Sequence, residues 1–174
     1  CHYCDDQAAA TTECWSCGRG DLSYPACGTE RVTALLSKVF PEARIDRLDR
    51  DRCSTKTLQS VLGSFREGKT DILVGTQMIA KGHDIPNVTL VGVICADTGL
   101  NMPDFRAAER TYQLLTQVSG RAGRGNRPGR VIIQTLRPDH PAIAGQVDRD
   151  FEAFIRNELQ IRRSLQRPPY TYLI

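Results

Sequence analysis

Apolar residues recur along the chain with two alternating periods, one typical of helices and one typical of strands. Four stretches carry apolar residues three and four positions apart, the spacing of one helix face: Val32–Val39, Leu58–Phe65, Phe105–Leu115 and Phe151–Leu159. Between and after them lie short segments that we expect to be strands. Asp71 to Gly75, Thr89 to Ala96 and Gly129 to Thr135 are rich in β-branched and other apolar residues, and Arg44 to Leu48 is a short strand between the first two helices. The pattern predicts helices and strands in alternation.

Capping and helix-breaking residues indicate where the helices begin and end. We expect Thr29 to cap the first helix, Pro41 to stop it, and the second helix to close near Gly68. The third helix should cover roughly Asp104 to Val118. The last should run from about Asp148 to Leu165, and the double proline after it should end it.

The runs Asp71 to Gly75 and Thr89 to Ala96 are continuously apolar, which is the pattern of strands buried on both faces. Strands that alternate with helices predict an α/β fold, a parallel sheet with helices on both faces. In such folds ligands bind in loops beyond the carboxyl ends of the strands. The informative residues should therefore come after Val74, Ala96 and Thr135, or lead into those strands.

Composition narrows the class of protein without identifying it. The chain has 174 residues, of which 40% are hydrophobic and 25% charged, as in globular domains. No apolar run approaches the roughly 20 residues of a membrane span, and no signal peptide opens the chain. The chain begins with Cys rather than Met, so we expect it to be processed, excised or incomplete. A net charge of +3 does not by itself establish nucleic-acid binding.

Seven cysteines are present, and four of them form two Cys-x-x-Cys pairs, Cys1/Cys4 and Cys14/Cys17. An odd number without a secretion signal argues against disulfides and for a reducing cytoplasm. Four thiolates suit the tetrahedral preference of zinc, although the nine residues between the pairs are fewer than in a usual zinc ribbon. We expect the other three to be ordinary thiols: Cys27, Cys53 and Cys95.

The stretch from Gly63 to Thr70 matches the phosphate-binding pattern G-x-x-x-x-G-K-[ST]. A working P-loop comes after a strand and opens a helix, so that its amides converge on phosphate. Here the segment ends a predicted helix and leads into a strand. This order favours a turn whose sequence matches the P-loop pattern by coincidence. The competing interpretation is a self-contained P-loop NTPase that uses Lys69, with Asp97 on the companion Mg²⁺-binding strand.

The stretch from Gln117 to Gly125 carries two arginines three positions apart, each preceded by glycine. Glycines permit close approach of the backbone, and two fork-shaped cations suit a polyphosphate. Contact with a nucleic-acid backbone, or a solvated turn, remains the alternative for this segment.

Gln117-x-x-Gly120-Arg121-x-Gly123-Arg124 resembles motif VI of superfamily 2 helicases, and Gly75 to Pro86 resembles their motif V. The similarity is greatest to the primosomal replication-restart helicases, and it extends to Asp97 to Leu100, Pro103 to Arg110, Gly28 to Val32 and the cysteine pairs. Asp5, Trp15 and Ala26 depart from the family pattern. The resemblance implies a RecA-like second helicase lobe preceded by part of a zinc-binding segment.

The resemblance also implies roles for single residues. Those facing ATP across the cleft would be Gly82, Asp84, Gln117, Arg121 and Arg124. Thr76 would contact the DNA backbone. Lys81 and His83 lie in the same loop and would contact DNA or alternatively ATP, although a histidine such as His83 is often structural. In the resembled family four cysteine pairs hold two zinc ions in a nested arrangement. The ligands here would be Cys1, Cys4, Cys14 and Cys17, which could also close one makeshift site.

Together these features predict a partial zinc-binding segment (1–20), a RecA-like lobe (21–147) and a helical extension (148–174) leading to a further domain. The implied function is ATP-dependent 3′–5′ DNA unwinding at stalled replication forks in the bacterial cytoplasm. ATP and Mg²⁺ would be bound mainly by a first lobe, and the isolated chain would be inactive. Implied partners are branched or single-stranded DNA, other primosome proteins and single-strand-binding protein, with no membrane. A zinc-dependent DNA-binding module without motor activity is the second alternative.

Overall fold

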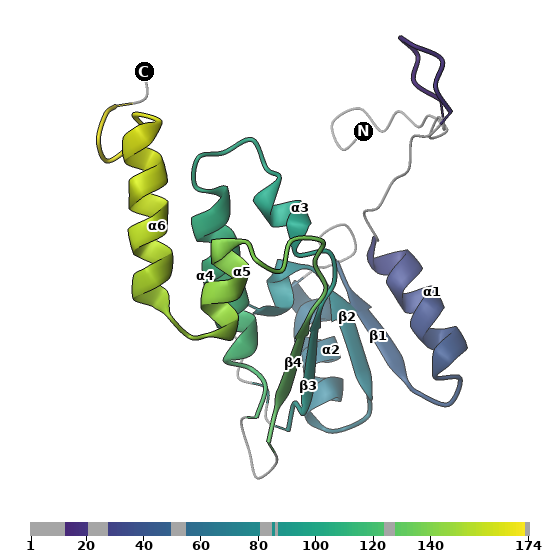
Figure 1. The fold of residues 1–174 in the computed structure, drawn as a ribbon. Coiled ribbons are helices and arrows are strands. Elements are labelled where there is room, and N and C mark those ends of the chain that lie inside the picture. The colour runs from purple at the N-terminus through teal and green to yellow at the C-terminus, as the bar shows by residue number, and fades with distance from the viewer. Residues whose placement is uncertain are drawn as a thin grey trace.

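The computed structural model describes residues 13–20, 28–49, 55–80, 85, 87–123 and 128–172 (Figure 1). The helices in this part of the chain are α1 (Thr29–Val39), α2 (Thr55–Arg66), α3 (Asp97–Leu100), α4 (Ala107–Ser119), α5 (Pro141–Val147) and α6 (Phe151–Ser164), with a 3₁₀ turn η2 (Gln77–Ala80). The strands are β1 (Ile45–Leu48), β2 (Ile72–Gly75), β3 (Leu90–Val93) and β4 (Arg130–Ile133). All four strands expected from the sequence are therefore confirmed, and the α/β class with them.

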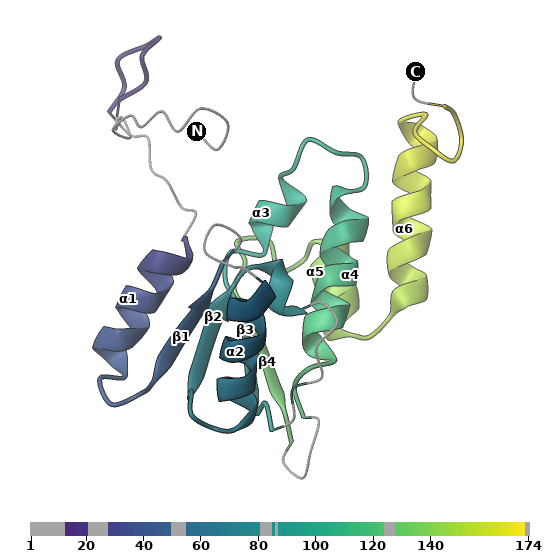
Figure 2. The same cartoon turned by 180° about the vertical axis from the view of Figure 1, so that it is seen from behind.

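The strands form two parallel pairs. β1 pairs with β2, with Ile45 opposite Ile72, and β3 pairs with β4, with Val91 opposite Val131. The four strands lie side by side in both views, but the ladder in the described residues is divided into two two-stranded sheets (Figures 1 and 2). Helix α2 lies behind the strands in Figure 1 and in front of them in Figure 2, and α1 flanks β1. All of the strand pairs described are parallel, as predicted.

Three small hydrophobic clusters hold the elements together. Leu48 of β1, Leu62 of α2 and Ile85 form the first, beneath β1 and β2. The second joins the end of β3 to α4 and α5, and the third joins α4 to α5 and α6: Ala96, Leu115 and Ile143, then Tyr112, Ala142 and Phe154. Full burial of a Leu or Phe side chain contributes about 1.5–3 kcal/mol. The C-terminal helices are thus packed onto the same body as the strands.

The prediction that the strand from Thr89 to Ala96 is buried on both faces is wrong; this strand is β3. Burial along β3 and β4 alternates between exposed and half-buried residues. Val93 and Ile133 face the cluster beneath α4 and α5, whereas Leu90 and Ile132 are 57% and 53% exposed. The apolar run arises because both faces carry apolar side chains, but the described helices cover one face only.

Three helix boundaries also differ from the expectation. Thr29 is the first residue of α1 rather than its cap, since Gly28 holds the extended cap conformation and the Thr29 hydroxyl donates to Asp49 instead (3.2 Å). Helix α4 begins at Ala107, because the carboxylate of Asp104 accepts the Arg106 amide (2.8 Å) just ahead of it. Helix α6 ends at Ser164, as expected, but begins at Phe151, because the carboxylate of Asp150 accepts the Ala153 amide (2.9 Å) and caps it. The stop at Pro41 is confirmed, with α1 ending at Val39.

Within the described residues, no helix is long and apolar enough to cross a membrane.

Candidate functional site

The end of β2 presents Thr76 on the surface. A Cβ atom on Gly75 would lie 2.6 Å from the Leu48 carbonyl oxygen, so only glycine allows β2 to end this close to β1. The Thr76 amide lies 3.4 Å from the same carbonyl, and the Thr76 carbonyl accepts the Ile79 amide at 3.2 Å as η2 begins. The backbone of Thr76 is therefore held in place while its side chain is exposed.

Helix α4 carries Gln117 in its last turn, and Arg121 follows in the turn just after the helix ends at Ser119. Gln117 is exposed and Arg121 is half-buried, with its Nε atom shielded from solvent. The Arg121 amide donates to the Val118 carbonyl (3.0 Å), in the turn just after Gly120. The backbone of Arg121 is thus fixed by a hydrogen bond, and its side chain is partly enclosed by the protein.

Two glycines bring the chain together beyond Arg121. Gly123 has a positive φ of 79°, and its amide donates to the Val88 carbonyl (2.9 Å), next to the start of β3. A Cβ atom on Gly129 would lie 2.1 Å from the Gly123 nitrogen, so the backbones on either side of residues 124–127 touch here. Any larger residue at Gly129 would force them apart and move the segment that carries Arg121.

The structure brings part of the predicted site together. The 3₁₀ turn η2, which comes directly after Thr76, packs against α4. The segment that resembles motif V therefore lies against the helix that leads into the segment resembling motif VI. The remaining predicted residues lie outside the described part of the chain, and their roles stay predictions: Cys1, Cys4, Lys81, Gly82, His83, Asp84 and Arg124.

Cys14 and Cys17 lie in one tight turn that closes with Gly18 at a φ of 68°. Hydrogen bonds from the Cys17 and Ser16 amides, and from the Cys17 side chain, lower the pKa of the Cys14 thiol. A lowered pKa favours the thiolate, which is the form that binds metal. No group of three or more His, Cys, Asp or Glu side chains able to hold a metal occurs among the described residues. This turn therefore fits one half of a tetrahedral thiolate site.

The segment from Gly63 to Thr70 is a helix-to-strand turn, as expected. Gly63 lies within α2, and Gly68 closes the helix with a φ of 71°. The Lys69 ammonium pairs with Glu67 (2.6 Å) on the surface, and the Thr70 hydroxyl donates to the Asp46 carboxylate. Since the amides lie at the end of a helix rather than at its beginning, the P-loop interpretation is wrong.

Asp97, the other residue of the P-loop interpretation, has a structural role at the carboxyl ends of β3 and β4. Its carboxylate accepts the Leu136 amide and the Thr135 hydroxyl, both at 3.0 Å. These two hydrogen bonds, that from the Leu136 amide first, lower the pKa of Asp97. The residue ties the end of β3 to the end of β4, and it does not stand beside a phosphate-binding loop.

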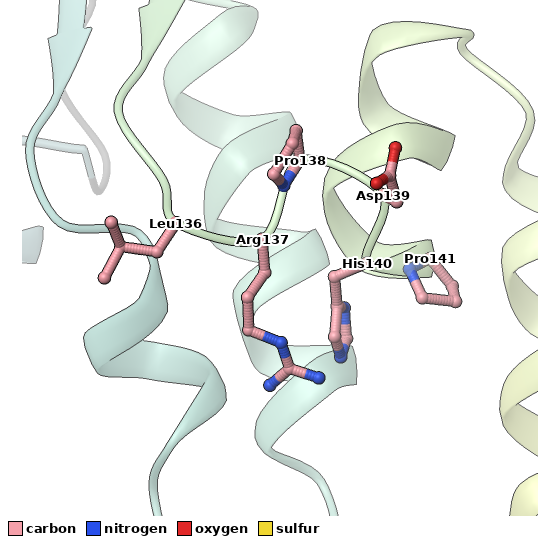
Figure 3. A pocket seen from close by; sticks show the side chains of 6 residues that line it. All are labelled: Leu136, Arg137, Pro138, Asp139, His140 and Pro141. Carbon is pink, nitrogen blue, oxygen red and sulfur yellow. The ribbon is translucent and has the colours of Figure 1, made fainter.

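A hollow of about 430 Å³ lies beyond the carboxyl end of β4 and is lined by residues 136–141 (Figure 3). The side chains of Arg137 and His140 extend in the same direction there, and Asp139 points away from them. Burial, and then the charge of Arg137, lower the pKa of His140. The position of this loop after a parallel strand is the signal by which the sequence pointed to residues after Thr135, but it singled out none of them.

Comparisons with known proteins identify relatives over the whole chain. The model of the helicase conserved C-terminal domain matches residues 26–126. Replication restart protein PriA from Bacillus subtilis is 52% identical over 99% of this chain and 22% of that protein. Those from Treponema pallidum and Haemophilus influenzae are 48% and 43% identical, over 100% and 99% of this chain. The chain spans about a quarter of the length of these relatives, 22%, 26% and 24% respectively.

Among solved structures, the helicase domain of Pyrococcus furiosus Hef aligns with 68% of this chain and 22% of that chain, at 24% identity and a TM-score of 0.38. That likeness is too distant to support an inference about function. The family of this chain is therefore assigned from its sequence relatives and not from this solved structure.

Proposed function

This chain belongs to the helicase conserved C-terminal domain family, and on that premise we propose that it forms the second motor lobe of an ATP-dependent DNA helicase that restarts stalled replication forks. The observation that carries the proposal is the family match over residues 26–126, which includes both the exposed Thr76 and the end of α4. The whole protein would be a 3′–5′ helicase, with ATP and Mg²⁺ held mainly by a first lobe elsewhere in the polypeptide.

Arg121 is the residue we assign to ATP hydrolysis, with Gln117 and Arg124 beside it in the sequence. Negative charge develops on the oxygens of the phosphoryl group as it is transferred, and a guanidinium fork stabilises that charge. The half-buried side chain of Arg121 supports the assignment, because a partly enclosed side chain loses less freedom than a fully exposed one when ATP arrives. Gly82 and Asp84 would line the same face of the cleft.

Thr76 is the described residue that we assign to DNA. Its exposed hydroxyl lies just beyond a strand whose end is held rigidly by Gly75, as suits a contact with a phosphate of the DNA backbone. Lys81 and His83, a few residues further on, would add charge and a second donor. Because η2 links Thr76 to the packing of α4, ATP and DNA would act on adjoining segments.

Zinc would be held by Cys1, Cys4, Cys14 and Cys17 together with cysteine pairs elsewhere in the polypeptide, two ions in all. The lowered pKa of Cys14 supports this, since the thiolate is already favoured without metal. When bound, the metal would supply structure rather than chemistry, closing a tetrahedral site. The proposed partners are branched or single-stranded DNA, other primosome proteins and single-strand-binding protein, in the bacterial cytoplasm.

Substitution of Arg121 in the full-length protein tests the proposal. Arg121→Ala should lower DNA-stimulated ATP turnover at saturating DNA by about 10³–10⁵, the loss seen when an arginine finger is removed. Arg124→Ala should behave alike, and Arg121→Lys should not restore turnover, because an ammonium lacks the planar fork. DNA affinity should change little.

The matched control is Arg130→Ala, which removes an exposed arginine at the start of β4. It should leave turnover unchanged. Weaker DNA affinity with a shallower salt dependence, together with normal hydrolysis at saturating DNA, would assign the arginines to the DNA backbone and refute the motor assignment.

A further inference from the structure

Helix α6 turns two charged side chains toward the body of the protein. Glu158 and Arg162 are 8% and 9% exposed, whereas the neighbouring Arg163 is exposed. Glu and Arg are seldom buried unless they are paired, because removing a charge from water is costly. A buried pair at this position on α6 therefore indicates a specific contact.

That contact is with the start of α4. Arg162 Nε donates to Glu158 on its own helix, and Arg162 Nη2 donates to Glu109 on α4, both at 2.8 Å. The same guanidinium lies 5.2 Å from the centroid of the Phe105 ring, just ahead of α4. Phe105 and Glu109 belong to the stretch Pro103 to Arg110, which resembles the helicase family but had no assigned role. The structure shows that the Phe105 ring and the Glu109 carboxylate both contact the Arg162 guanidinium.

The contact continues along one face of α4. The Tyr112 ring stacks on Phe154 of α6, with centroids 4.3 Å apart and planes 5° apart. The Thr116 hydroxyl lies 2.8 Å from Gln146 Oε1 of α5. Glu109, Tyr112 and Thr116 are spaced as one helix face, so α5 and α6 support α4 from its first turn to its last. We call these contacts the α6 brace.

The α6 brace matters because the far end of α4 carries Gln117 and leads directly into Arg121. At 1.5 Å per residue, the last helical residue, Ser119, lies roughly 15 Å along the axis from Glu109, and Arg121 follows in the turn beyond it. A helix of this length is stiff, so a small change of direction at its start moves its end. The paired charges at the start select one direction, since any other leaves a buried charge without its partner.

We propose that Arg162 is a positioning residue for Arg121: through Glu109 and Phe105 it sets the direction of α4, and so places the Arg121 guanidinium for ATP hydrolysis. This rests on the proposed function of Arg121. It makes the stretch beyond residue 148 part of the motor rather than a passive connection, and it gives any domain attached beyond α6 a route to the rate of hydrolysis.

The test measures DNA-stimulated ATP hydrolysis by the full-length protein carrying Arg162→Ala. Turnover at saturating ATP and DNA should fall by about 10- to 10²-fold, the scale expected for a misplacement near 1 Å. The KM for ATP and the DNA affinity should change little, because ATP is held mainly by the first lobe. The matched control, Arg163→Ala, removes the adjacent exposed arginine and should leave turnover unchanged.

A second variant separates positioning from folding. The combination Glu109→Met, Glu158→Leu and Arg162→Met replaces the three charges by apolar groups of similar size, a change that often preserves or raises stability. We expect a melting temperature near that of the natural protein but turnover still about tenfold or more lower, because apolar contacts do not specify direction. Natural turnover in this variant would overturn the proposal.

The combination of Arg162→Ala with Arg121→Ala provides the sharpest measurement. If Arg162 acts only through Arg121, adding Arg162→Ala to Arg121→Ala should cause no further loss. Multiplicative losses would overturn the positioning role. Normal turnover in Arg121→Ala alone would instead refute the proposed function, so the two failures are distinguishable.

Discussion

His140 caps helix α5 with its ring. Its Nδ1 atom accepts the Ala142 amide at 3.2 Å, the place usually taken by a hydroxyl or a carboxylate. Only the neutral ring can accept there, and burial, together with the smaller effect of the Arg137 charge, lowers the pKa of His140. The cap is therefore sensitive to pH near neutrality, which a serine or aspartate cap would not be.

We predict that this cap weakens on acidification. Because the folded-state pKa lies below the ordinary value of about 6.5, its contribution is complete above about pH 6.5 and is lost as the pH falls through the lower folded value. His140→Asn keeps an acceptor that does not titrate, so its free energy of unfolding should fall less between pH 7 and pH 5. Chemical denaturation across this range measures the difference. Identical pH dependence of the two proteins would exclude the ring as a pH-sensitive cap.

Among the elements, the β3–β4 pair has two unlike faces. Val93 and Ile133 pack toward α4 and α5, while Leu90 and Ile132 face outward and are more than half exposed. Exposed apolar side chains on neighbouring strands favour association between molecules. Because burial alternates along β4, Ile132 is exposed and Ile133 is half-buried, so the same substitution at these two neighbours compares the two faces.

We predict opposite outcomes for two neighbouring substitutions. Ile132→Thr should change the free energy of unfolding by less than about 0.5 kcal/mol and reduce self-association of the 174-residue chain. Ile133→Thr should cost about 1–3 kcal/mol, since it places a hydroxyl against the cluster around Leu115. Thermal melting and light scattering on both variants report the two quantities. A larger loss of stability for Ile132→Thr would mean that its face is covered.

At the scale of the whole molecule, the chain carries residues that we assign to ATP hydrolysis. Its described residues, however, include no phosphate-binding loop that could hold ATP. The stretch from Gly63 to Thr70, which matches the P-loop sequence pattern, forms the end of α2 and the turn into β2, and Lys69 pairs there with Glu67. In the proposed mechanism, ATP hydrolysis requires both walls of a cleft between two lobes. One lobe alone leaves Arg121 without a phosphate to stabilise.

The isolated 174-residue chain should therefore show no DNA-stimulated ATPase activity above contaminant controls. In the full-length protein, Lys69→Ala should leave turnover unchanged and alter stability by less than about 0.5 kcal/mol, because the lysine pairs on the surface. Both are measured in the same assay. Turnover by the isolated chain that disappears in Lys69→Ala would restore the P-loop interpretation.

The sequence by itself determined the α/β class, the four strands, four of the helices and the family, because periodicity and motif spacing are local properties. Boundaries were less predictable, since they depend on partners remote in the chain. Thr29 looks like a cap, yet its hydroxyl binds Asp49 instead, 20 positions away. The short helices α3 and α5 were not predicted, because four and seven residues carry too little periodic signal.

Only the tertiary structure decided which apolar and charged residues are buried. The continuous apolar run of β3 reads as buried on both faces, but burial depends on which helices pack against each face. Glu and Arg are mostly exposed in proteins, and Arg162 is buried because Glu109, 53 positions earlier, supplies its partner. The site divides in the same way. Its residues were recognisable from motifs, whereas the contact that sets the direction of α4 exists only where α4 and α6 meet.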